Sequence, residues 1–231
     1  MAVAGVASLL GAAGAQEGGG LIKEAIQKKL AAVKESSAAN KAALKKYTWT
    51  ETVQTSLNGQ VKSTTQSSCR YGPDGQVVKT PIGPPPQQPK EGPLRARMMA
   101  EKKEELTGYM AQVKGVIGLY VPPDAQRMEA AFQAGNLSFG RPGAGEAGLN
   151  FKSYAKPGDS MILDFDTATK KMASLIVNSS VSDPSQTVTL TVQFASLPDG
   201  TSFPSQTVLN APAKGIQVTT SNSNYQKLPG Q

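Results

Sequence analysis

Histidine is absent from all 231 residues of this chain. Its absence excludes the Ser-His-Asp and Cys-His schemes of nucleophilic catalysis and the usual zinc ligand sets. It also removes the side chain that most often serves as a general base near neutral pH. We therefore predict a protein that is not an enzyme and that carries no metal or other cofactor.

Cysteine occurs once, at Cys69, so the chain can form no intramolecular disulfide. The neighbouring Arg70 could lower the pKa of this thiol. However, the sequence offers neither a histidine nor a second cysteine to complete a reactive pair. We interpret Cys69 as a small buried apolar residue.

Long hydrophobic runs are missing as well. No stretch approaches the ~18 residues that a membrane-spanning helix requires. We therefore expect a soluble mature chain with no transmembrane segment.

Positive charge exceeds negative charge by seven, and the excess is concentrated near the N-terminus. Residues 21–46 contain seven lysines and two glutamates, whereas residues 186–231 contain only three charged side chains. A basic helix of this kind suits an anionic surface of the cell envelope, with contacts expected from Lys28, Lys29, Lys34 and Lys41. Arginine is scarce and is not interleaved with aromatic residues, so we do not expect nucleic acid as a partner.

The first residues have the character of a leader. Residues 1–15 form an apolar run that ends in Ala13-Gly14-Ala15, a small-x-small pattern that signal peptidase accepts. We interpret residues 1–15 as the remnant of a signal peptide and residues 16–20 as a flexible spacer. The alternative is an Ala/Gly-rich N-terminal segment without that role. With a leader, the protein would be periplasmic or secreted in a bacterium, and no cysteine follows it to carry a lipid anchor.

Hydrophobic periodicity predicts one α+β domain over residues 21–228. Apolar residues recur at helical spacing after Leu21, and the period then changes to that of a strand over residues 47–57. Tyr47, Trp49, Val53 and Leu57 share one face of this strand, and Thr48, Thr50, Thr52 and Gln54 take the other. Asn58-Gly59 is a strong hairpin signal, because a type I′ turn requires a positive φ at both central residues. A proline-rich loop at 81–93 precedes a helical insertion at 94–135.

The last third of the chain consists of alternating segments separated by turn residues such as Pro198-Asp199-Gly200. Strands at this spacing favour an antiparallel meander. We therefore predict a curved antiparallel sheet or half-open β-barrel. The N-terminal helix and the helical insertion would cover its concave face.

Three other patterns could carry chemistry, and each has a simpler interpretation. Asp164 and Asp166 lie two apart on one predicted strand and could hold a divalent ion, but a solvated strand face leading into a turn explains them equally well. Glutamates 101, 104 and 105 suit a solvated helix face with local ion pairs better than a metal site. The glycines of 140–145 lack the lysine of a phosphate loop.

Four segments carry a resemblance to known proteins. They are Tyr47-Thr48-Trp49, residues 120–124 (YVPPD), residues 156–160 (KPGDS) together with residues 163–166 (LDFD), and residues 197–204 (LPDGTSFP). On these segments the chain resembles an uncharacterised group of exported bacterial proteins over nearly its whole mature length. In architecture it is similar to the bacterial outer-membrane lipoprotein carrier and receptor superfamily. That similarity implies a half-open barrel that holds acyl chains beneath a helical lid.

The methionines and apolar residues of the sheet and the insertion form our candidate binding surface. Methionine side chains are flexible and polarizable, and they suit varied apolar ligands as well as ordinary core filling. We predict that the ligand would contact Trp49, Val53, Met98, Met99, Met110, Val113, Ile117 and Phe132. The function predicted from sequence is therefore the binding or carriage of an apolar molecule. The alternative is a structural or interaction protein of the envelope that uses the basic first helix or the proline-rich loop.

Overall fold

The computed structural model describes residues 38–83, 93–140, 146–169 and 171–229. The chain divides into two compact units, Met1–Ala39 and Asn40–Gln231, and every strand belongs to the second. The predicted leader, the spacer, Lys28, Lys29, Lys34 and most of the proline-rich loop lie outside the described residues.

Ten strands, the long helix α2 and the shorter helix α3 make up most of the second unit. After a helical segment at 38–44 the order is β1 (Tyr47–Leu57), β2 (Gln60–Tyr71), β3 (Val77–Ile82), α2 (Pro93–Ile117), α3 (Ala125–Gln133), β4 (Leu137–Gly140), β5 (Glu146–Lys152), β6 (Ser160–Asp166), β7 (Met172–Ser180), β8 (Thr187–Ser196), β9 (Ser202–Ala211), a 3₁₀ turn (Pro212–Lys214) and β10 (Ile216–Lys227). None of the helices that the structure describes is long and apolar enough to span a membrane.

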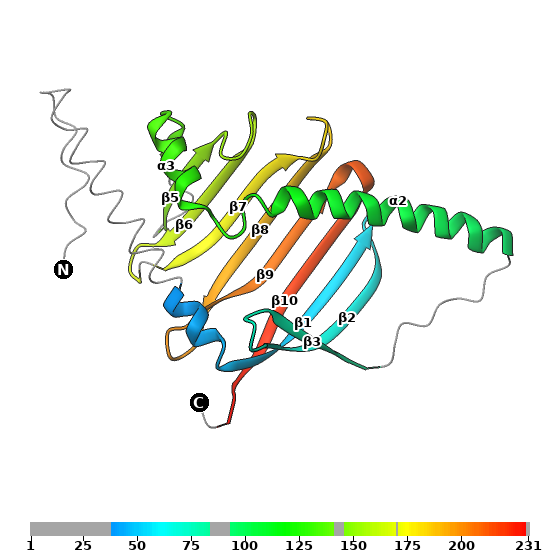
Figure 1. Cartoon of the computed structure of the whole chain (residues 1–231), viewed down its shortest axis with the longest axis horizontal. Coiled ribbons are helices and arrows are strands. Elements are labelled where there is room, and N and C mark those ends of the chain that lie inside the picture. The colour runs from blue at the N-terminus through cyan, green and yellow to red at the C-terminus, as the bar shows by residue number, and fades with distance from the viewer. Residues whose placement is uncertain (1–37, 84–92, 141–145, 170, 230–231) are drawn as a thin grey trace, which may run out of the picture. The chain divides into compact units, whose positions relative to one another are not determined.

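All ten strands form one antiparallel sheet in the order β3-β2-β1-β10-β9-β8-β7-β6-β5-β4 (Figure 1). Strands that are neighbours in the sheet are consecutive in sequence except where β1 meets β10. The two edge strands, β3 and β4, are connected through α2 and α3. This topology confirms the predicted α+β class and the predicted open, curved antiparallel sheet.

The predicted hairpin between β1 and β2 is confirmed. Asn58 and Gly59 have φ values of 50° and 76°, as a type I′ turn requires. The Asn58 amide donates to the Gly215 carbonyl oxygen at 2.7 Å, which ties this turn to the start of β10. A Cβ on Gly215 would overlap the Asn58 side chain, and φ at Gly215 is +61°, so this position requires glycine.

The two faces of the sheet differ in composition because successive side chains point to opposite sides. We call the face against which α2 packs the inner face, and the opposite one the outer face. On the inner face, Tyr109 and Val113 of α2 form a buried cluster with Val188, Ala211 and Ile216. This core cluster attaches the helix to one end of β8, β9 and β10, where Figure 1 shows α2 crossing the strands.

Candidate functional site

The strand registers place apolar residues next to one another across the inner face. Leu209 pairs with Leu190, Leu190 pairs with Val177, and Val177 pairs with Met161. The row continues to Phe151 on β5. Residues that face each other across antiparallel strands lie on the same side of the sheet. The inner face is therefore continuously apolar from β9 to β5.

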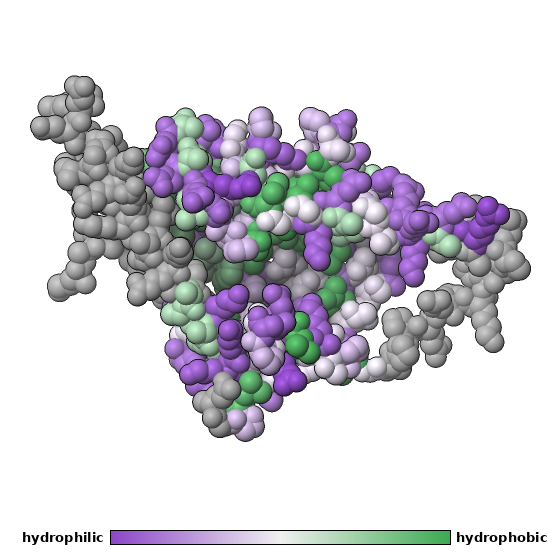
Figure 2. Space-filling view, in the orientation of Figure 1, coloured by the Kyte–Doolittle hydropathy of each residue, from purple (hydrophilic) through white to green (hydrophobic). Residues whose placement is uncertain are grey.

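The burial of this row changes along the sheet. Leu190, Val177 and Met161 are 5% exposed or less, whereas Val53 on β1 and Leu209 on β9 are half-buried. In Figure 2, drawn from the side of α2, hydrophobic residues gather beside the helix and the surface is hollowed below it. The accessible part of the inner face therefore lies along β1, β10 and β9.

An aromatic cluster occupies the other end of the same strands. Trp49 stacks on Tyr225 with ring centroids 5.6 Å apart and an angle of 11° between the planes. Tyr71 lies 5.5 Å from Trp49, and Phe203 lies 4.3 Å from Tyr225. Tyr47 meets Tyr225 edge-on. Offset and edge-to-face pairs of this kind add to the stability that burial provides.

A tyrosine–carboxylate hydrogen bond borders the aromatic cluster. The Tyr47 hydroxyl donates to Asp199 Oδ2 at 2.5 Å, and the Thr201 amide donates to Asp199 Oδ1 at 3.0 Å. These hydrogen bonds, that of Tyr47 first, hold the pKa of Asp199 well below its usual value, and Lys227 lowers it further.

Replacing Tyr47 with phenylalanine should raise the pKa of Asp199, because the carboxylate loses its strongest donor. A group whose pKa is depressed by folding adds stability above its unfolded pKa, and that stability is lost as the pH falls through the folded value. The Y47F variant should therefore lose less stability on acidification than the parent chain. A carboxyl ¹³C NMR titration of Asp199 checks this, and an unchanged titration midpoint in Y47F would show that the hydroxyl does not set the pKa.

A second polar feature anchors the C-terminal end of α2. The Tyr120 hydroxyl donates to Asp159 Oδ2 at 2.5 Å and lies 2.9 Å from Ser179 Oγ. Burial raises the pKa of Tyr120, and the hydrogen bond to Asp159 raises it further. The same carboxylate accepts the backbone amides of Tyr154, Ala155 and Lys156 at 2.6 to 3.0 Å. This buried network fixes the segment after α2 to the 154–159 loop and to β7.

The structure distributes the eight predicted ligand contacts over several places. Val113 is fully buried in the core cluster, and Met110 and Ile117 pack against it half-buried. Trp49 belongs to the aromatic cluster and Val53 follows it on β1. Phe132 is half-buried on α3. Met98 and Met99 belong to α2, but their side chains lie outside the described residues.

The other candidate groups have ordinary structural roles. Asp166 Oδ1 accepts the Thr169 amide at 2.6 Å, as a turn residue does. The interpretation of Asp164 as part of a solvated strand face is wrong: it is 2% exposed, its Oδ2 accepts the Ser174 hydroxyl at 2.6 Å, and its buried Oδ1 has no hydrogen-bond partner among the described residues. Glu105 pairs with Lys214 at 2.6 Å. Within the described ranges, no three His, Cys, Asp or Glu side chains gather to hold a metal ion.

The interpretation of Cys69 as a buried residue is confirmed, since its side chain is inaccessible. Burial raises the pKa of its thiol, so Arg70 does not activate it. Cys69 belongs to β2, where it pairs with Trp49 of β1 on one side and with Lys79 of β3 on the other. Lys79 Nζ lies 2.5 Å from Glu51 Oε1 and forms an ion pair with it.

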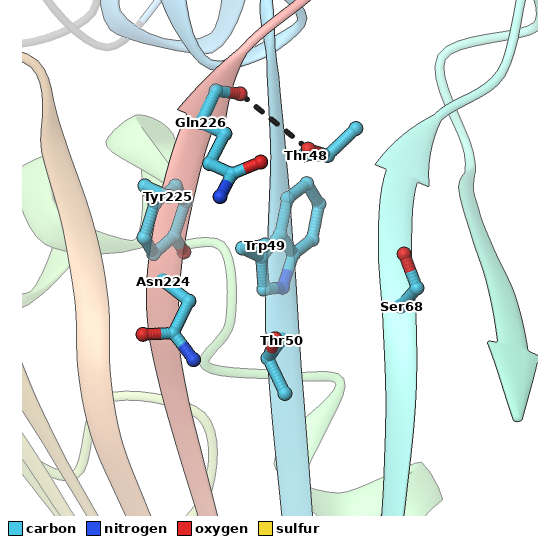
Figure 3. A pocket seen from close by; sticks show the side chains of 7 residues that line it. All are labelled: Thr48, Trp49, Thr50, Ser68, Asn224, Tyr225 and Gln226. Atoms are coloured by element: carbon cyan, nitrogen blue, oxygen red, sulfur yellow. Dashed lines mark hydrogen bonds between the residues drawn. The ribbon is translucent and has the colours of Figure 1, made fainter. Parts of the chain in front are cut away.

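Sequence reasoning missed a pocket of about 360 Å³ where β1 meets β10 (Figure 3). Trp49 and Tyr225 line it together with five neutral polar residues, Thr48, Thr50, Ser68, Asn224 and Gln226. The pocket coincides with a β-bulge, since the register between β1 and β10 shifts between Thr48 and Thr50. The residue type at position 224 is the sequence signal for this bulge. Asn224 has a φ of 54°, a conformation that asparagine tolerates better than most residues.

No protein-family model, no curated protein and no solved structure matches this chain.

Proposed function

We propose that this protein is an exported, non-catalytic binding protein that holds an apolar ligand, such as an acyl chain, on the inner face of its sheet. The observation that carries this proposal is the row of apolar residues that crosses the inner face from β9 to β5, which α2 meets at one end through the core cluster. The half-buried stretch between the core cluster and the aromatic cluster, centred on Val53, is the proposed ligand position.

Physical chemistry favours an apolar guest at this position. Apolar surface that is removed from water contributes about 25 cal/mol per Å² to binding. Val53 and Leu209 are half-buried and retain surface that a ligand could cover. The ring system of Trp49 and Tyr225 closes one end of the stretch, and Val218 and Leu209, which pack against the core cluster, border the other. Across the sheet the neighbours of Val53 are Thr65 and Thr220, and Glu51 and Asn222 follow toward the aromatic rings. The apolar surface in this stretch is therefore that of Val53, Val218 and Leu209, over which the acyl part of a ligand would lie.

Trp49 is the only tryptophan in the chain and borders this stretch, so its fluorescence responds to a ligand there. Because Trp49 also lines the pocket at the β1–β10 junction, the variants below locate the ligand. A fatty acid carrying a bromine or nitroxide quencher on its acyl chain should quench Trp49 in a saturable manner. An unlabelled fatty acid should reverse the quenching by competition. Absence of saturable quenching at concentrations up to about 100 μM would contradict the proposal, because an affinity that weak corresponds to less than about 6 kcal/mol of binding free energy.

Two neighbouring positions of β1 provide a matched pair of variants. Val53 is on the inner face, whereas Gln54 is the next residue and points to the outer face; both are half-buried. We expect Val53→Lys to weaken the quenching at least tenfold, because an acyl chain bound over this position would remove the ammonium group from water. Gln54→Lys should leave it unchanged. Equal effects of the two variants would show that the ligand does not lie on the inner face.

A further inference from the structure

The outer face at the β1–β10 junction forms a second site, separate from the apolar inner face. Thr48 faces Gln226 across the strands and Thr50 faces Ser68, so these four side chains share the outer face. Asn224 belongs to the bulge between them. Figure 3 shows these polar side chains on three adjacent strands around the pocket.

The polar groups of this pocket keep most of their hydrogen-bonding capacity. Thr48 Oγ1 donates to the Gln226 carbonyl oxygen at 3.5 Å, a long contact that leaves the hydroxyl able to accept. Among the described residues, the side chains of Thr50, Ser68 and Asn224 make no hydrogen bond. Hydroxyl and amide groups both donate and accept. Ser68, Asn224 and Gln226 are exposed and Thr48 and Thr50 are half-buried, so a ligand with hydroxyl groups could replace the water that these side chains bind.

Charge is absent from the lining: all five polar residues are neutral. Arg70 faces Thr48 across β1 and β2 and is exposed, but it does not line the pocket. A neutral lining offers no compensation for desolvating an ionic ligand. It suits a ligand that is itself neutral and that carries many hydroxyl groups.

The bulge explains why a hollow exists on an otherwise flat strand surface. Asn224 and Tyr225 together oppose Trp49 alone, because Thr48 pairs with Gln226 and Thr50 with Ser223. An extra residue of this kind bends the strand and redirects its side chains, and bulges are enriched near binding sites. Tyr225 turns its ring to stack on Trp49 at the inner face, while Asn224 lines the pocket.

We infer that this pocket binds a neutral carbohydrate, with Thr50, Ser68 and Asn224 as hydrogen-bonding residues. Its volume of about 360 Å³ matches one or two sugar rings of a longer chain. Trp49 and Tyr225 border both sites, but the hydrogen-bonding residues Thr50, Ser68 and Asn224 are distinct from Val53 and Leu209, so the inference does not depend on the apolar ligand.

Maltohexaose and the hexasaccharide of N-acetylglucosamine are the probes for a ¹⁵N–¹H NMR titration of the full chain. At least one should shift the amide signals of Thr50 and of residues 224–226, with a dissociation constant on the order of 1 mM. Thr50→Val and Asn224→Gly should each weaken binding about fivefold or more, through loss of one or two hydrogen bonds. Glycine retains the positive φ at position 224, and unchanged spectra elsewhere would confirm the fold of each variant.

Two controls distinguish carbohydrate recognition from non-specific effects. Thr191→Val, on the outer face of β8 away from the pocket, should leave the affinity unchanged. Binding should also persist in about 0.5 M NaCl and in Arg70→Gln, because no charge is involved. If neither probe shifted these signals at about 10 mM, the inference would be overturned. Binding restricted to an acidic oligosaccharide such as oligogalacturonate, and lost in salt or in Arg70→Gln, would overturn it as well.

Discussion

Replacing Asp159 with alanine should destabilise the folded chain by about 4 kcal/mol, more than any single substitution on the surface. The carboxylate is 4% exposed and accepts three backbone amides as well as the Tyr120 hydroxyl. Alanine would leave the three backbone amides without their acceptor at a largely buried position, while the Tyr120 hydroxyl would keep its contact with Ser179. Urea denaturation followed by circular dichroism measures the loss.

Asp183 provides the matched control for this substitution. It also accepts a backbone amide, that of Ser185 at 2.7 Å, but in an exposed turn. Asp183→Ala should therefore cost less than about 1 kcal/mol, since water replaces the lost acceptor. Tyr120→Phe should fall between the two, because Asp159 keeps its three backbone donors. A loss below about 1 kcal/mol in Asp159→Ala would show that the network does not hold the 154–159 loop in place.

Replacing Val113 with aspartate should release α2 from the sheet. Val113 is fully buried between the helix and the ends of β8, β9 and β10, and a carboxylate there would have neither water nor a partner. We expect a loss of about 4 kcal/mol or more, together with stronger binding of a hydrophobic dye as the inner face becomes accessible. Denaturation and dye fluorescence measure the two effects.

Ala111→Asp is the corresponding control on the same helix. Ala111 is exposed, so the new carboxylate stays in water and the cost is that of helix propensity alone, below about 1 kcal/mol. Equal stability of the two variants would mean that the core cluster does not attach α2 to the sheet.

Local patterns predicted much of the sheet because its strands follow one another in sequence. The alternation of β1 over Tyr47–Leu57 and the turn at Asn58-Gly59 were both predicted, and the structure confirms them. β4 was missed, because its four residues, Leu137–Gly140, are too few to show a period. β10 continues to Lys227, but the polar run after Thr220 lacks alternating apolar residues, so its last part carries no strand signal in the sequence.

The sites were harder to predict because they combine residues that are distant in sequence. Asp159 lies within the KPGDS segment, but its role depends on Tyr120, 39 residues earlier. The outer pocket depends on how β1 pairs with β10, a contact between the two ends of the folded unit. Of the predicted ligand contacts, Val113 proved to be a fully buried core residue, which a helical stripe alone does not distinguish from a binding surface.

Binding of an apolar ligand is the central claim, and native mass spectrometry of the protein purified from the organism that produces it tests that claim most directly. We predict a population heavier than the bare chain by the mass of a lipid, released on collisional activation and strongly reduced in Val53→Lys but not in Gln54→Lys. A single species at the mass of the bare chain, in the parent protein and in both variants, would contradict the claim.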